Sequence, residues 1–119
     1  MADDSGRGEM ARERLARDGD LHAPHLIDLE FASALRRMEG VDIITPARAN
    51  AALDAFGLLG LTRYPHTSML GRVWELRANV GSYDAAYVAL AEALGCVLVT
   101  ADRRLAKVRD ARCPVEVLR

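Results

Sequence analysis

The sequence has few aromatic residues, few cysteines and no long hydrophobic run. Aromatic residues make up 5% of the 119 residues, and there is one tryptophan. The two cysteines, Cys96 and Cys113, show no CxxC or other metal-ligand spacing, so we expect free thiols in a reducing compartment. No apolar stretch is long enough to span a membrane, and the Asp- and Gly-rich N-terminus does not resemble a secretory signal. These absences predict a cytoplasmic protein without a membrane anchor.

The sequence also lacks an excess of charge of either sign. It contains 16 lysine and arginine residues against 17 aspartate and glutamate residues, for a net charge of −1. This balance gives no sign of a strongly basic nucleic-acid binder, but it does not exclude one, because an enzyme that acts on nucleic acid needs only a local basic rim. Half of the residues are hydrophobic, and the length suits one domain with a real core. We therefore expect a single domain over residues 1–119.

The histidines and the tryptophan give no strong functional signal. His22 and His25 are three residues apart, His66 is distant in sequence, and no further ligand stands at a spacing typical of zinc sites. We therefore expect surface or loop histidines rather than a zinc site. Trp74 falls within a helical pattern, and we expect it in the core rather than as a platform for base stacking.

Helical and extended patterns alternate along the chain. The predicted helices cover 9–17, 26–38, 45–59, 66–77, 83–94 and 103–108, and the predicted extended segments cover 21–24, 61–64, 96–100 and 115–118. Thr45-Pro46 is the clearest helix start, and Ser82 is the expected cap of the helix at 83–94. This alternation predicts an α/β fold, a three-layer α/β/α domain with a mostly parallel central sheet.

Three carboxylates stand out by their positions. Asp102 follows the β-branched run at 96–100, which is typical of a buried parallel strand, and ligands bind at the carboxyl ends of such strands. Asp84 lies in the first turn of the most apolar helix, and Glu30 lies among apolar neighbours. Carboxylates that converge on a strand end need a cation, and their oxygens suit Mg²⁺ or Mn²⁺. Such a site could hydrolyse a phosphodiester bond.

Each carboxylate also has a purely structural interpretation. Asp84 could stabilise the helix dipole, and Asp102 could cap the helix that follows it. Glu30 could be a solvated or salt-bridged helix residue. Spacing alone leaves these alternatives open.

Two segments in the C-terminal half resemble the VapC-type PIN-domain toxins: YDAAYVALA at 83–91 and LVTADRRL at 98–105. Upstream, the residues HAP at 22–24, LE at 29–30 and ALRR at 34–37 match a further segment of that family. The resemblance covers nearly the whole chain from about Asp3. It implies a Mg²⁺- or Mn²⁺-dependent endoribonuclease with an RNA substrate, a VapB-type antitoxin partner and a homodimeric state.

The resemblance assigns roles residue by residue. Glu30, Asp84 and Asp102 correspond to the catalytic and metal-binding acidic residues. Thr100 matches a hydroxyl position beside the site, and Arg103 is expected at its mouth.

The sequence departs from the family at its N-terminus. The family begins with an apolar strand, central in the sheet, that ends in an aspartate, whereas this sequence opens with residues that resemble the following loop. A late start-codon assignment and gene decay are both open as explanations. Loss of the strand and its aspartate gives an alternative function, a catalytically impaired or inactive PIN remnant that only binds antitoxin or dimerises.

Overall fold

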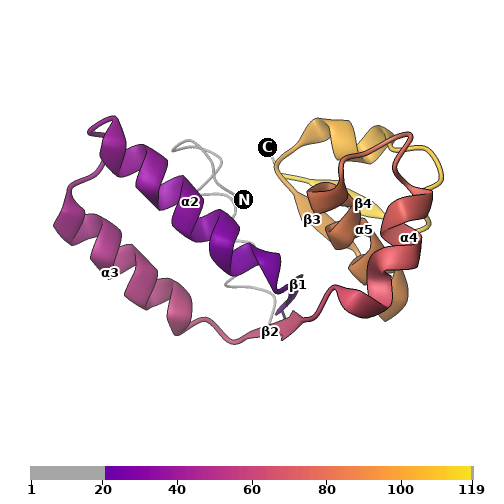
Figure 1. The fold of residues 1–119 in the computed structure, drawn as a ribbon, viewed down its shortest axis with the longest axis horizontal. Helices are drawn as coiled ribbons and strands as arrows, with labels where there is room; N and C mark the ends of the chain where they lie inside the picture. The colour runs from indigo at the N-terminus through magenta and orange to yellow at the C-terminus, as the bar shows by residue number, and fades with distance from the viewer. Residues whose placement is uncertain (1–20, 119) are drawn as a thin grey trace.

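The computed structural model describes residues 21–118, and its elements follow one another as helices and short strands (Figure 1). Their order and bounds are β1 (Leu21–Pro24), α2 (Leu26–Gly40), α3 (Pro46–Gly57), β2 (Leu61–Tyr64), η1 (Thr67–Met69), α4 (Leu70–Glu75), α5 (Ser82–Leu94), β3 (Leu98–Thr100), η2 (Arg103–Lys107) and β4 (Val115–Val117). The predicted α/β class is confirmed. The helix expected at 9–17 lies outside the described residues.

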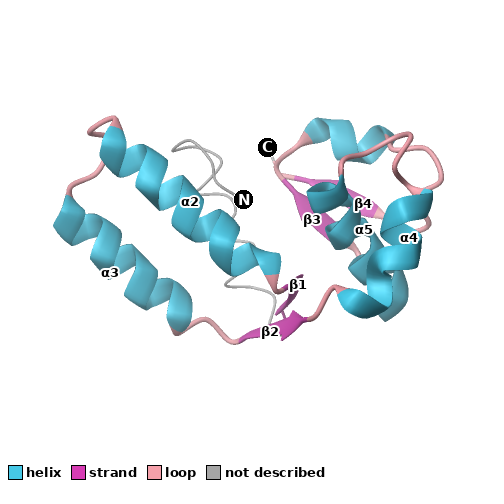
Figure 2. Cartoon of the chain, viewed as in Figure 1, coloured by secondary structure: helices cyan, strands magenta, loops and turns pink. Residues whose placement is uncertain are grey.

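All the strand pairing in the described part of the chain is parallel, as the sequence predicts. β1 pairs with β2, with Leu21 beside Leu61, and β3 pairs with β4, with Leu98 beside Val115. Within residues 21–118 these are two separate two-stranded sheets rather than one central sheet (Figure 2). β1 and β3 are each bonded to one partner strand of this segment, so each sheet remains narrow.

Helices α2 and α3 form a hairpin that extends away from the rest of the chain (Figure 1). Thr45 starts α3 as predicted, because its hydroxyl accepts a hydrogen bond from the Arg48 amide at 3.2 Å. Phe31 and Phe56 stack between the helices with ring centroids 4.1 Å apart. Leu29 of α2 is 76% exposed.

The main core forms where α5 packs against α4 and the second sheet. Most of the middle of α5 is buried, as its apolar sequence predicts. Leu76, Val88 and Leu98 join this core with little or no exposed surface. Gly95 ends α5 in a left-handed conformation with φ of 65°, which glycine adopts without a steric penalty.

Two local expectations about this region are wrong. Gly81 rather than Ser82 is the N-cap of α5, and Ser82 is the first helical residue. Trp74 is 66% exposed, and the Arg77 guanidinium lies over its ring at 4.4 Å. The predicted helix at 66–77 is divided into η1 and the short α4, and Met69 and Leu76, rather than Trp74, fill the interior.

Polar side chains connect elements that are distant in sequence. Arg63 of β2 binds both carboxylate oxygens of Asp28 in α2 at 2.8 Å. The His66 Nε2 atom accepts a hydrogen bond from the Leu26 amide at 3.1 Å and thereby caps the start of α2. No helix in residues 21–118 is long and apolar enough to cross a membrane.

Candidate functional site

Asp102 lies just beyond the carboxyl end of β3, as predicted. Thr100 holds its backbone, because the threonine hydroxyl accepts a hydrogen bond from the Asp102 amide at 3.0 Å. The Asp102 side chain also caps η2 by accepting from the Arg104 amide at 2.9 Å. The structural role considered for Asp102 is therefore present in the fold, and it uses one carboxylate oxygen.

Arg104 binds the Asp102 carboxylate with its guanidinium group. Its Nε atom lies 3.0 Å from Oδ1 and its Nη2 atom lies 2.7 Å from Oδ2. The carboxylates of Asp102 and Asp84 both raise the pKa of Arg104, the hydrogen bond to Asp102 being the largest cause. Arg104, rather than its neighbour Arg103, is therefore the cation that binds Asp102.

Asp84 is half-buried in the first turn of α5, directly before the buried residues Ala85 and Ala86. The N-terminus of a helix favours a negative charge, so this position stabilises the carboxylate. The packing of the two alanines fixes the backbone that carries it. Asp84 therefore has a rigid support close to the end of β3.

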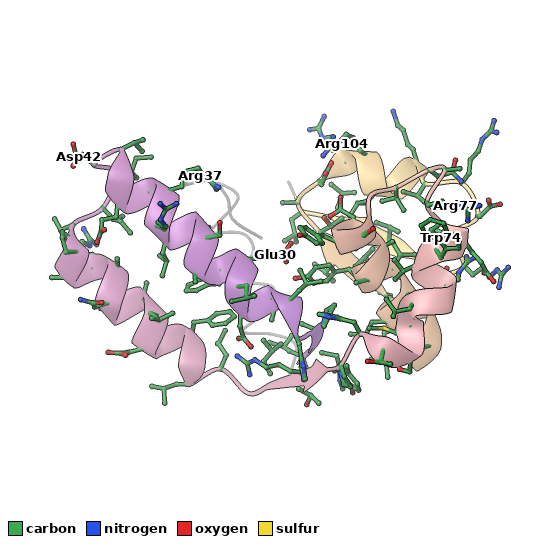
Figure 3. The ribbon with its side chains drawn as sticks, viewed as in Figure 1. Glu30, Arg37, Asp42, Trp74, Arg77 and Arg104 are labelled. Atoms are coloured by element: carbon green, nitrogen blue, oxygen red, sulfur yellow. The ribbon has the colours of Figure 1, made fainter. Side chains whose placement is uncertain are left out.

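Glu30 lies on α2 and reaches across to α5 (Figure 3). The Tyr87 hydroxyl of α5 donates a hydrogen bond to the Glu30 Oε1 atom. Glu30 is half-buried, so it is not the freely solvated helix residue that one interpretation expected. The contact connects the acidic residue of the hairpin with the helix that carries Asp84.

The Tyr87 hydroxyl group feels the charges of two of the predicted carboxylates, Glu30 and Asp84. Burial raises the pKa of the Tyr87 hydroxyl well above its ordinary value, and the hydrogen bond to Glu30 raises it further. The charges of Glu30, Asp84 and Asp28 act in the same direction. Asp84 thus lies within electrostatic range of both Tyr87, which binds Glu30, and Arg104, which binds Asp102.

The carboxylates fit a hard divalent cation by their chemistry, although they do not form a complete cage. Among residues 21–118, no three His, Cys, Asp or Glu side chains form a group that could hold a metal ion. Mg²⁺ needs only one or two protein carboxylates, because water and substrate phosphates supply its other ligands. The Arg104 guanidinium already binds Asp102, and it lies within electrostatic range of Asp84. The donor set therefore suits Mg²⁺ or Mn²⁺.

Sequence reasoning missed the two polar partners of this site. The site residues expected from the sequence include neither Tyr87 nor Arg104, and Arg103 is expected at the mouth of the site instead. Tyr87 stands three residues after Asp84, so both lie on the same side of the α5 N-terminus. That spacing is the signal in the sequence that could have identified Tyr87. No local pattern distinguishes Arg104 from Arg103.

Comparison with known proteins gives a consistent set of relatives. The model of the PIN domain family matches residues 1–111. VapC ribonuclease Mb0985 of Mycobacterium bovis is 47% identical over 118 residues, which cover 99% of this chain and 88% of the relative. Ribonuclease VapC1 of Mycobacterium tuberculosis is 42% identical over 115 residues, 96% of this chain and 86% of the relative. Ribonuclease VapC3 of the same organism is 41% identical over 107 residues, 90% and 77% of the two chains.

Proposed function

The chain belongs to the VapC family of PIN-domain proteins, and from that membership we propose that it is a divalent-metal-dependent endoribonuclease, the toxin of a toxin–antitoxin pair. The observation that supports the proposal most directly is the position of Asp84, which lies in electrostatic range of Tyr87, the partner of Glu30, and of Arg104, the partner of Asp102. The relatives are named as VapC ribonucleases, which supports RNA as the substrate.

The proposed roles come from the family resemblance, and the contacts of the side chains support them. Asp84 and Asp102 would hold the ion, Mg²⁺ or Mn²⁺, and Glu30 of α2 would contribute a further carboxylate. Bound there, the ion supplies positive charge that polarises a phosphate oxygen of the RNA. Thr100 fixes the Asp102 backbone, and the exposed Arg103 is available to contact an RNA phosphate at the mouth of the site.

The proposed partners follow from family membership. A VapB-type antitoxin would bind the toxin and block the acidic site, and two toxin chains would form a homodimer. We infer that the protein acts in the cytoplasm, because the proposed substrate is RNA.

The proposal is tested by cleavage of RNA in the presence of Mg²⁺ or Mn²⁺ and after addition of EDTA. We expect EDTA to abolish cleavage and Asp84→Asn to lower its rate by about 100-fold or more, because even the outer partners of metal ligands are worth about 10–100-fold. Asp54→Asn, which changes an exposed aspartate of α3, is the matched control and should cleave at the wild-type rate. Undiminished cleavage by the Asp84→Asn variant would refute the site.

A second candidate function, binding without catalysis, has its own supporting observation. The described residues hold no complete three-ligand group, and Arg104 already binds both oxygens of Asp102. Tight binding of the antitoxin by a folded sample that shows no metal-dependent loss of RNA would favour this alternative.

A further inference from the structure

Tyr87 combines a packing role with a polar role that packing does not require. Its ring lies against the core formed by Leu76, Val88 and Leu98. Phenylalanine would fill that space equally well, because the aromatic rings are the same. The hydroxyl group has a separate partner, the Glu30 carboxylate, to which it donates a hydrogen bond. The phenol is therefore explained by Glu30 rather than by the core.

The Tyr87 hydroxyl group binds Glu30 from α5, the same helix that carries Asp84. Tyr87 follows Asp84 by three positions in α5, whose middle is buried, so the tyrosine has a rigid base. Glu30 belongs to α2, of which only Ile27 is buried. A glutamate on a loosely covered helix has several rotamers available, and each must be given up when the carboxylate binds a cation. A fixed hydrogen-bond donor on α5 restricts the rotamers of Glu30 before the cation binds.

The hydrogen bond from Tyr87 also leaves the Glu30 carboxylate able to bind a cation. A hydroxyl group donates one hydrogen, and here it engages Oε1, whereas a carboxylate has two oxygens with about four acceptor positions. The Oε2 atom is left for another ligand. Metal-binding side chains are commonly oriented by a second hydrogen bond of this kind, which raises the affinity for the ion.

We propose that Tyr87 is a positioning residue, which orients the Glu30 carboxylate toward the divalent ion and thereby sets the affinity of the site. This inference rests on the proposed metal-dependent function. It assigns to the Tyr87 hydroxyl a role in ion binding, and to the Tyr87 ring a role in the core.

The test is calorimetric titration of the full chain with Mn²⁺, together with the Mn²⁺ dependence of RNA cleavage. Tyr87→Phe should keep the wild-type circular dichroism spectrum and bind Mn²⁺ about tenfold more weakly. The Mn²⁺ concentration for half-maximal cleavage should rise by a similar factor, and cleavage at saturating Mn²⁺ should stay near the wild-type rate. Tyr83→Phe is the matched control, because Tyr83 is 72% exposed on the other side of Asp84, and it should bind like wild type.

A double variant separates positioning from a general effect on structure. In the Glu30→Gln background the carboxylate is absent, so Tyr87→Phe should weaken Mn²⁺ binding no further. Wild-type affinity in Tyr87→Phe, or an equal loss in both backgrounds, would overturn the inference while leaving the proposed nuclease intact. A wild-type chain that neither binds Mn²⁺ nor cleaves RNA would overturn both.

Discussion

Asp102 and Glu30 each have a polar partner in the folded chain, but the two partners differ in kind. Tyr87 is a neutral donor, and it leaves one oxygen of Glu30 for other ligands. Arg104 is a cation, and it binds both oxygens of Asp102. A neutral donor can orient a carboxylate for a metal ion, whereas a cation competes with the ion for the same charge.

We therefore expect Arg104→Ala to raise the affinity of the site for the divalent ion. The Arg104 side chain is 86% exposed, so water largely screens its ion pair with Asp102. The gain in affinity for the divalent ion should therefore be modest. We expect the Mn²⁺ concentration for half-maximal RNA cleavage to fall by about threefold, which corresponds to a typical surface ion pair. Arg48→Ala, which changes an exposed arginine of α3, is the control and should leave this concentration unchanged. An increase in the Arg104→Ala variant would mean that the guanidinium supports the site instead.

At the scale of elements, one ion-pair network fixes α4, α5 and the loop before β4. Arg72 of α4 binds both oxygens of Glu92 in α5, at 2.7 and 3.0 Å, and also donates to the Asp110 carbonyl. The Arg112 amide donates to Glu92 at 2.6 Å. Both side chains of the central pair are mostly buried. The network thus holds the C-terminal part of α5 while the N-terminal part carries Asp84.

This network predicts a pH-dependent contribution to stability. The hydrogen bond from Arg72 is the main cause that lowers the pKa of Glu92 below its ordinary value. A lowered carboxyl pKa stabilises the fold above the ordinary glutamate pKa of about 4.3, and the stabilisation is lost as the pH falls through the folded-state pKa. We expect Glu92→Gln to lower the free energy of unfolding by about 2 kcal/mol at pH 7, since hydrogen bonds to charged groups contribute about that much.

The measurement is urea denaturation of both proteins between pH 7 and pH 3, and the difference should shrink toward the acid end. Glu75→Gln is the control, because Glu75 binds Arg72 in an exposed i,i+3 pair. This substitution should lower the free energy of unfolding by less than about 0.5 kcal/mol. A pH-independent difference would show that the charge of Glu92 is not what stabilises the pair.

At the scale of the whole molecule, the described chain is unevenly packed. Helix α5 buries six residues, whereas the hairpin helices α2 and α3 bury one residue each. The hairpin also exposes several large apolar side chains: Leu29, Val41, Ile43, Leu53 and Leu58. Few buried contacts allow an element to open locally without unfolding of the whole domain.

We expect the amides of the α2–α3 hairpin and those of α5 to differ in their rates of hydrogen exchange. Amides in the middle of α3 should exchange at least about tenfold faster than those in the middle of α5, because local opening suffices to expose them. Hydrogen–deuterium exchange with mass spectrometry would measure both in one sample, and peptides from β3 provide an internal reference for the core. Equal protection of α3 and α5 would show that another surface covers the hairpin in solution.

The sequence by itself determined the α/β class, most element positions and the three carboxylates of the candidate site. These features depend on interactions within a few residues, such as the Thr45-Pro46 helix start, the apolar α5 and the β-branched residues of β3. Family resemblance then linked the carboxylates to one chemistry.

Only the tertiary structure decided which side chains meet. It turned Trp74 outward, divided the expected sheet into two pairs within residues 21–118, and gave Asp102 the cation of Arg104 rather than of Arg103. It also joined Glu30 to Tyr87 across 57 positions of sequence. Contacts of this kind depend on how distant elements pack and which rotamers that packing allows, and no local pattern contains this information.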